Sequence, residues 1–315
     1  MENTTMENTR TKTTRNSLIL LLTAAIWGMA FVSQSKGMDY MHPFTFNGVR
    51  SLIGAASILV YILISRKIAG DKAAPLDWKL NVKAGLLCGI FLTIASTLQQ
   101  FGIKYTSVGK AGFITTLYII FVPMFGIFLK KKVAPVVWAA AVMAAVGMYL
   151  LCMTESLRLG AGDIMVFLCA IAFAIQIMTV DHYAARIDGA VVSCIQFTVC
   201  GVVCCIGALI WGQPTLGQLQ EGLGALLYAG VLSCGVGYTL QIVGQKGLNP
   251  TVAALIMSLE SVIATISGWI AYKIGFLTTD QTLTARQIAG CVIVFAAVIL
   301  VQLPPEWFRF GKKNA

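Results

Sequence analysis

The chain has 315 residues, of which 57% are hydrophobic and 11% are charged, and its mean hydropathy is +0.81. Soluble domains carry about a quarter charged residues, so this composition excludes a water-soluble globule of this length. The net charge of +10 does not indicate nucleic-acid binding, because the basic residues are divided among short segments between apolar stretches. The composition therefore predicts an all-α polytopic membrane protein.

The N-terminal segment, residues 1–16, is polar and follows no fold pattern, so we expect a disordered cytoplasmic N-terminus. It contains the sequence MENT twice, which makes Met6 an alternative start to Met1. The apolar run that follows is one of many. We therefore interpret it as a spanning helix that is retained and not as a cleaved signal peptide.

Ten apolar stretches follow, each of about the length that crosses a bilayer as a helix. Lipid offers no hydrogen-bond partners to a backbone, so each stretch should be helical. A cytoplasmic tail, residues 304–315, is expected after the last one. In chain order the stretches cover residues 17–36, 44–65, 84–103, 108–129, 134–153, 162–180, 190–211, 222–245, 250–273 and 286–303.

The distribution of basic residues predicts the orientation in the membrane. With the N-terminus inside, the inner segments hold sixteen Lys and Arg residues and the outer segments hold six, while Arg50 lies within a span. An excess of basic residues marks the cytoplasmic side. We therefore expect a multi-pass protein of the plasma membrane with both termini in the cytoplasm.

An internal repeat joins the two halves of the chain. Residues 97–114 and 239–256 align at a constant offset of 142 and share six of eighteen positions, among them the paired Thr-Leu-Gln sequences and a following lysine. Both segments lie at the junction between the third and fourth predicted helix of a half. The alternative interpretation is a chance similarity between two apolar helices.

The repeat also predicts a symmetry. Each half, residues 17–153 and 160–303, would hold five helices, and an odd number makes the second half enter the membrane from the opposite side. The result is an inverted repeat, which recurs in secondary transporters because two similar halves give two states of similar energy. The sequence thus predicts ten transmembrane helices built as two inverted five-helix repeats.

Several motifs, in their order and spacing, resemble the EamA branch of the drug/metabolite transporter superfamily. They are Trp27-Gly28, the pair His42-Pro43 followed by Arg50, the run Tyr105–Pro123, and Ala253–Ser261, which is similar to that family's Leu-Glu-Pro in the ninth helix. The resemblance covers the chain after residue 16 and implies transport of a small organic solute, usually export, with substrates from amino acids to diverse metabolites.

Two departures weaken the transfer of a substrate from any particular relative. Ser261 stands where the family often has proline. The glutamate common at the ends of the fourth and ninth helices is absent, since these ends read Leu129–Lys132 and Tyr272–Gly275.

Two charged residues lie inside predicted spans, where a charge costs about 2.5–3.5 kcal/mol. Glu260 follows Pro250 by ten residues, about 15 Å along a helix, which places it near the midplane. It could bind a proton or a cationic group of the substrate, or it could serve a neighbouring helix as a structural partner. Arg50 could meet a substrate carboxylate, pair with Glu260, or extend its guanidinium to the outer interface.

Amides and aromatic residues complete the candidate site. Gln99 and Gln241 occupy equivalent positions of the repeat and should lie on opposite sides of the midplane, one for each half of a central cavity. Gln196 follows Gly189 at the spacing of Arg50 from Pro43, so this pair could be repeat-related too. Bridging between helices is the alternative role of these amides. Trp27 and Tyr118 could form part of the cavity wall or pack in the core.

No cofactor or metal site is predicted. The nine cysteines form no CxxC pair, and we interpret them as small apolar packing residues. The chain has no Walker A sequence and no catalytic motif of an intramembrane enzyme. We therefore expect a secondary transporter that moves a small molecule across the bilayer by alternating access, with proton exchange, antiport and facilitated efflux as alternatives. An intramembrane enzyme and a non-transporting receptor or assembly subunit are the other classes, and a homodimer remains open.

Overall fold

The structure is a computed structural model that describes residues 2–70, 75–105, 108–129, 133–152, 160–277 and 282–302. Within these ranges every element is helical and no strand occurs. The helices are α1 (Glu2–Gly37), α2 (Pro43–Ala69), α3 (Trp78–Tyr105), α4 (Val108–Thr116), α5 (Tyr118–Phe128), α6 (Pro135–Cys152), α7 (Ala161–Tyr183), α8 (Gly189–Gly207), the π-helical segment η2 (Ala208–Gly212), α9 (Leu216–Glu221), α10 (Leu223–Leu227), the π-helical segment η3 (Tyr228–Gly237), α11 (Tyr238–Gln245), α12 (Pro250–Met257), α13 (Leu259–Lys273) and α14 (Ala285–Gln302).

The described residues contain seven helical segments that are long and apolar enough to cross a membrane. These are Thr13–Gly37, Pro43–Ala69, Trp78–Tyr105, Ala161–Tyr183, Gly189–Gly212, Leu223–Gln245 and Pro250–Lys273. Three shorter apolar helices, Ile114–Phe128, Pro135–Leu150 and Ala285–Val301, lie where the sequence predicts the fourth, fifth and tenth spans. The all-α membrane fold is thus confirmed, whereas the count of ten and the inverted repeat stay predictions.

The N-terminal segment differs from the expectation. Helix α1 begins at Glu2, so the polar residues predicted to be disordered continue the first helix. A physical reason is that adding residues to an existing helix costs far less than nucleating a new one. The predicted cytoplasmic tail lies outside the described residues.

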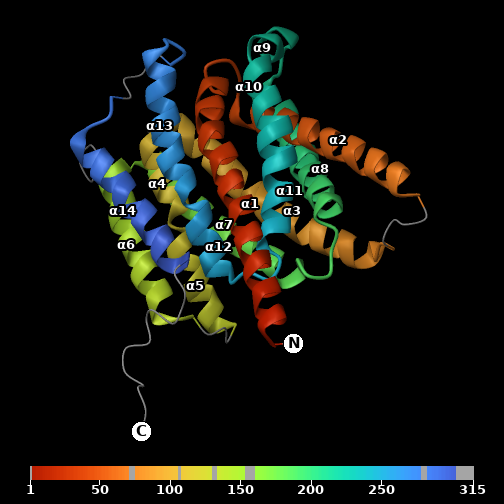
Figure 1. The fold of residues 1–315 in the computed structure, drawn as a ribbon. Coiled ribbons are helices and arrows are strands. Elements are labelled where there is room, and N and C mark those ends of the chain that lie inside the picture. The colour runs from red at the N-terminus through yellow and green to blue at the C-terminus, as the bar shows by residue number, and fades with distance from the viewer. Residues whose placement is uncertain are drawn as a thin grey trace.

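The helices pack around α1, α3, α7 and α11 (Figure 1). We call the side at which α1 begins, the lower side in Figure 1, the N-terminal face. Asn16 near the start of α1 donates to the carbonyl of Lys246 just after α11, at 2.6 Å, whereas Ser33 near its end donates to Ala225 in α10, at 2.8 Å. Thus α1 runs antiparallel to the α10–α11 segment. Helix α6 packs on α14 at one edge of the bundle, and α2 packs on α8 at the other.

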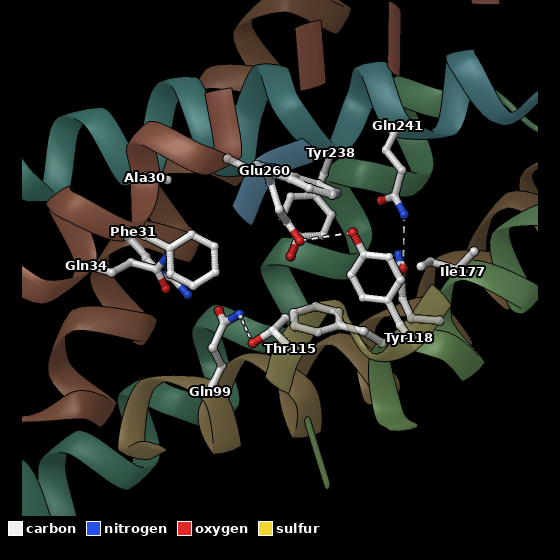
Figure 2. A pocket seen from close by; sticks show the side chains of 14 residues that line it. Ala30, Phe31, Gln34, Gln99, Thr115, Tyr118, Ile177, Tyr238, Gln241 and Glu260 are labelled. Atoms are coloured by element: carbon white, nitrogen blue, oxygen red, sulfur yellow. Dashed lines mark hydrogen bonds between the residues drawn. The ribbon is translucent and has the colours of Figure 1, made fainter. Parts of the chain in front are cut away.

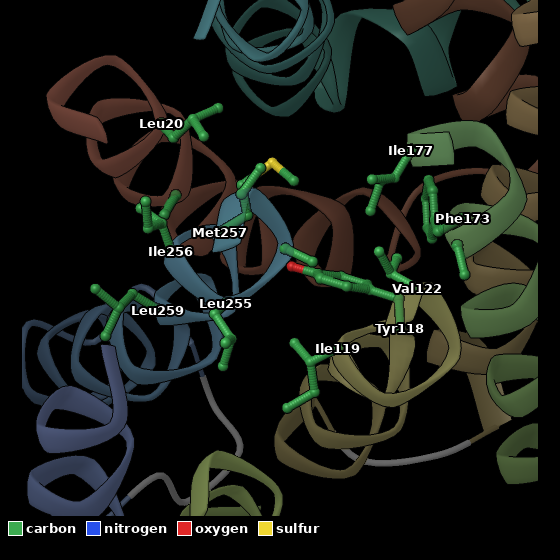
Figure 3. Close-up of a cluster of buried hydrophobic side chains, with 14 of the residues drawn as sticks. Leu20, Tyr118, Ile119, Val122, Phe173, Ile177, Leu255, Ile256, Met257 and Leu259 are labelled. Carbon is green, nitrogen blue, oxygen red and sulfur yellow. The ribbon is translucent and has the colours of Figure 1, made fainter. Parts of the chain in front are cut away.

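Two of the predicted spans are broken near their middle. The break between α4 and α5 falls at Leu117, and the break between α12 and α13 falls at Ser258. Hydroxyl groups bond to nearby carbonyls at both places: Thr116 to Gly112 at 2.9 Å, and Ser258 to Leu255 at 2.7 Å. Side chains that compete for backbone carbonyls in this way bend helices. The residues that follow the breaks, Tyr118 and Ile119 on α5 and Leu259 on α13, pack in the buried hydrophobic cluster shown in Figure 3.

Small residues bring other helices close together. A Cβ atom at Gly85 would lie 2.6 Å from the side chain of Ile195, and one at Gly89 would lie 2.9 Å from Val199. The small-residue face of α3 therefore packs inside the bundle, against α8. The described cysteines form no disulfides, and Cys88, Cys169, Cys200, Cys204 and Cys234 are buried.

Candidate functional site

A narrow central cavity is lined by seven of the polar and charged side chains that are buried in the bundle (Figure 2). Its open volume is about 40 Å³. That volume holds only about two or three water molecules, far less than an organic solute needs. Its lining residues come from both halves of the chain: Trp27, Ala30, Phe31, Gln34, Arg50, Gln99, Thr115, Tyr118, Phe173, Gln176, Ile177, Tyr238, Gln241 and Glu260.

Glu260 is the acidic group of the cavity. It lies in the first turn of α13, just after the break at Ser258, and is 4% exposed. Tyr118, in the first turn of α5, donates its hydroxyl to the carboxylate at 3.0 Å, the one hydrogen bond to this carboxylate among the described residues (Figure 2). The two residues are 142 positions apart, the offset of the sequence repeat. Each helix break thus delivers one partner of this pair.

Close backbone packing fixes the position of Glu260. At Gly28, α1 approaches α13 so closely that a Cβ atom would lie 2.7 Å from the carbonyl oxygen of Glu260 and 2.6 Å from Ile263. Glycine is therefore required for this contact. The Trp-Gly pair of the first helix supplies a cavity residue, Trp27, and the close approach beside it.

Arg50 is the basic group of the cavity. It is 5% exposed and makes no ion pair or hydrogen bond with a described residue, and its Nε atom is buried without a partner. The guanidinium lies 5.3 Å from the centre of the Phe46 ring, one turn earlier on α2. In this structure Arg50 therefore neither pairs with Glu260 nor extends its guanidinium to the surface, and its contact with a substrate carboxylate stays a prediction.

The segment η3 holds α2, and with it Arg50, against the cavity. A Cβ atom at Gly230 would lie 2.9 Å from the carbonyl oxygen of Arg50, so the two backbones are in close contact. Tyr238 follows η3 directly and lines the cavity, with its ring centre 4.5 Å from that of Trp27. The Trp27 indole donates to Ser233 of η3 at 3.4 Å. These two rings form an aromatic wall of the cavity.

The structure brings six of the seven predicted site residues to this one cavity: Trp27, Arg50, Gln99, Tyr118, Gln241 and Glu260. The exception is Gln196, which is fully buried with neither amide atom paired, and whose backbone packs against Gly89 of α3. The spacing from a helix start does not fix the direction in which a residue faces. The prediction missed Gln34, Thr115 and Tyr238 as lining residues.

A second, larger cavity of about 630 Å³ opens at the N-terminal face, between the ends of α2, α7 and α11 and the starts of α3 and α8. Its charged groups have protein partners. Asp188 accepts from the backbone at Ala190 and Val191, and Lys246 donates to the carbonyl of Ile187 at 3.2 Å. Arg186 lies over the ring of Tyr183. In the part of the chain that the structure describes, no group of His, Cys, Asp and Glu side chains could hold a metal ion.

A family model describes almost the whole chain. The model of the EamA-like transporter family matches residues 15–153 and, a second time, residues 160–303. Each half of the chain therefore matches the family model separately.

Named relatives and a solved structure resemble the chain over most of its length. An uncharacterized transporter of Archaeoglobus fulgidus is 27% identical over 90% of this chain and 84% of its own. The uncharacterized transporter YwfM of Bacillus subtilis is 24% identical over 92% of this chain and 94% of its own. One crystal structure of a protein superposes with a TM-score of 0.73 at 16% identity, covering 94% of this chain and 99% of that one, which shows a shared fold.

Proposed function

Since the chain belongs to the EamA-like transporter family, we propose that it is a secondary transporter that moves a small zwitterionic solute, such as an amino acid, through the central cavity. The family match and the relatives already show that the protein is a multi-pass integral membrane transporter and not an enzyme. The proposal of a zwitterionic solute rests on one observation. Arg50 and Glu260 have opposite charges, line the same cavity and lack an ionic partner among the residues that the structure describes.

The cost of this arrangement favours a ligand. A buried charge without a counter-charge costs several kcal/mol, and the two side chains do not neutralise each other here. A solute that carries both a carboxylate and an ammonium group would pair with both, the carboxylate on Arg50 and the ammonium group on Glu260. The rings of Trp27 and Tyr238 would face the apolar part of the solute.

The small volume of the cavity supports alternating access. A space of about 40 Å³ does not admit an amino acid, so the helices around it would have to separate for the solute to enter. In the proposed cycle, the two five-helix halves rock against each other around the cavity. We assign the membrane to the plasma membrane, both termini to the cytoplasm and the direction to efflux, on the basic-residue distribution and the family resemblance.

Proton coupling is part of the proposal, with Glu260 as the group that takes up and releases the proton. Its carboxylate has one neutral donor, Tyr118, and the other titratable and charged groups that line its cavity are Tyr238 and Arg50. Cys169 of α7 is also near enough to interact with its charge. A solute ammonium group and a proton would compete for the same carboxylate, which couples their movements. Substrate antiport and uncoupled efflux are the alternatives.

Solute flux in proteoliposomes tests the proposal. The purified protein is reconstituted in vesicles loaded with one unlabelled amino acid at a time, and the uptake of the same radiolabelled amino acid is followed with and without a pH gradient. We expect counterflow for at least one amino acid, and a dependence on the gradient. The Glu221→Gln variant, which changes an exposed glutamate of α9, is the control for Glu260→Gln.

The outcomes separate the classes of function. Absence of counterflow for every zwitterion, in vesicles whose protein is shown to be folded, would contradict the proposed substrate class and favour a receptor or assembly subunit. Counterflow that ignores the pH gradient would contradict proton coupling alone.

A further inference from the structure

Four glutamines line the central cavity at equivalent positions of the two halves. Gln34 on α1 and Gln176 on α7 are 142 positions apart, as are Gln99 on α3 and Gln241 on α11. All four are buried. The residues that share a half therefore form two potential amide pairs, Gln34 with Gln99 and Gln176 with Gln241.

The two pairs are in different states. In one, the amide nitrogen of Gln241 donates to the amide oxygen of Gln176 at 3.3 Å (Figure 2). In the other, Gln99 turns to the hydroxyl of Thr115 instead, at 3.3 Å, and the amide oxygen of Gln34 is buried without a partner. Figure 2 shows Gln34 and Gln99 on one side of Glu260, and Gln241 on the other. One pair is closed and its counterpart is open.

The two pairs also lie toward different faces of the bundle. Gln176 and Gln241 are close to the ends of α7 and α11, which lie at the N-terminal face. Gln34 and Gln99 are close to the ends of α1 and α3 and therefore lie toward the opposite face. The structure thus has a closed amide pair on the N-terminal side of Glu260 and an open one on the other side.

We propose that these four glutamines line the path of the solute and act as two reciprocal latches, so that the Gln34–Gln99 pair forms when the Gln176–Gln241 pair opens. The inference rests on the proposed transport function, and it adds Gln34 and Gln176 to the site. Its physical basis is a balance. Breaking a buried amide–amide hydrogen bond is costly, and each state keeps one such bond while the other is broken, so the two states have similar energies.

Unpaired amide atoms also offer contacts to a solute. In this state the Gln34 oxygen, the Gln176 nitrogen and the Gln241 oxygen are buried without partners. An ammonium group could donate to the oxygen of Gln34 on one side of Glu260 or to that of Gln241 on the other (Figure 2), and a carboxylate could accept from the nitrogen of Gln176. A solute held by these groups would stabilise an intermediate state in which neither amide pair is closed.

Hydrogen–deuterium exchange of the whole protein in nanodiscs, without ligand, tests the latches. Gln241→Leu removes the closed pair, so we expect faster exchange at the ends of α7 and α11 together with slower exchange at the ends of α1 and α3. The shift in the equilibrium should be about fivefold, the worth of one hydrogen bond. Gln176→Leu breaks the same bond from the other helix and should reproduce this pattern, whereas Gln99→Leu should not open the N-terminal face.

The chain offers matched controls. Gln245, one turn from Gln241, donates to the carbonyl of Ile177 on the same helix α7 but does not line the cavity. Gln100 joins α3 to the carbonyl of Gln34 in the same way. Gln245→Leu and Gln100→Leu should change exchange only near the substituted residue. The latch proposal would be overturned if these controls slowed hydrogen exchange far from the substituted residue. It would also be overturned if Gln241→Leu and Gln176→Leu both changed exchange only near the substituted residue.

The failure of the latches and the failure of the transport proposal are distinguishable. The exchange experiment uses no solute, so its result does not depend on the substrate. In a parallel arm, an equimolar mixture of the twenty standard amino acids is added to the wild type. Slower hydrogen exchange in α1 and α7 near the cavity after the addition would support the proposed substrate class. Unchanged exchange would contradict that class. The reciprocal pattern in the variants would still decide whether the latches exist.

Discussion

The central cavity and the cavity at the N-terminal face differ in size and in the state of their charges. The central one has about 40 Å³ of open volume, and its two charged side chains are buried with no ionic partner in the described part of the chain. The other has about 630 Å³, and its Asp188 and Lys246 have hydrogen-bond partners in the protein, while Arg186 lies over the Tyr183 ring as Arg50 lies over the ring of Phe46. Judged by volume alone, the cavity at the N-terminal face would be the binding site, whereas the buried charges without ionic partners indicate the central cavity.

Buried charged groups without an ionic partner are therefore a stronger sign of a binding site than a large open volume. Charged groups that already have partners gain little from a ligand. Buried charges that lack partners gain much, because the ligand replaces the water they gave up on folding. Substitutions in the two cavities should therefore have unequal effects.

The largest effect is expected for Glu260→Gln. The variant removes the negative pole of the cavity but keeps the size of the side chain, so binding of a zwitterion should fall about 100-fold and the dependence of flux on pH should vanish. Counterflow in proteoliposomes at several pH values measures both. The Glu221→Gln control should transport like the wild type. Unchanged pH dependence in Glu260→Gln would remove this residue from the coupling step.

The next effect is expected for Arg50→Gln, which should weaken binding about 30-fold for solutes with a carboxylate. Solutes whose carboxylate is converted to an amide should lose much less, because they never formed the ion pair. Competition between the two solute types in the flux assay gives the ratio. Equal losses for both types would show that Arg50 acts through packing and not through the carboxylate.

A smaller effect is expected for Tyr118→Phe. The variant removes the one hydroxyl that donates to Glu260 and keeps the ring, and a hydrogen bond to a charged group is worth about a factor of ten. The pH at which flux is half-maximal should change with the loss of this donor. A lower rate with an unmoved pH profile would indicate a packing role.

The smallest effect is expected in the larger cavity. Arg186 is exposed and lies over Tyr183, so Arg186→Gln should change binding and flux by less than about a factor of two. The same flux assay in proteoliposomes applies. A loss in this variant as large as that of Arg50→Gln would reverse the ranking of the two cavities.

Much of the site followed from the cost of polar groups in a membrane. Glu260, Arg50, Gln99 and Gln241 were predictable because each stands in an apolar span, and the structure places all four on one cavity. Gln34 was harder to find because it lies near the polar end of α1. Its place is nevertheless encoded, since it lies 142 positions before Gln176.

What the sequence did not predict depends on rotation and on local backbone geometry. Gln196 looks equivalent to Arg50 by spacing, but its helix faces α3 at that position. The breaks at Leu117 and Ser258 carry no proline or glycine of their own. They depend on the competition between hydroxyl groups and the helix backbone, which sequence patterns register weakly.

The most direct test of the account is an experimental structure of the protein in nanodiscs with a transported amino acid bound. We expect the solute in the central cavity, which must be wider than in the present state, with its carboxylate on Arg50 and its ammonium group within hydrogen-bond distance of Glu260. A solute bound in the cavity at the N-terminal face, with Arg50 and Glu260 still unpaired, would contradict it.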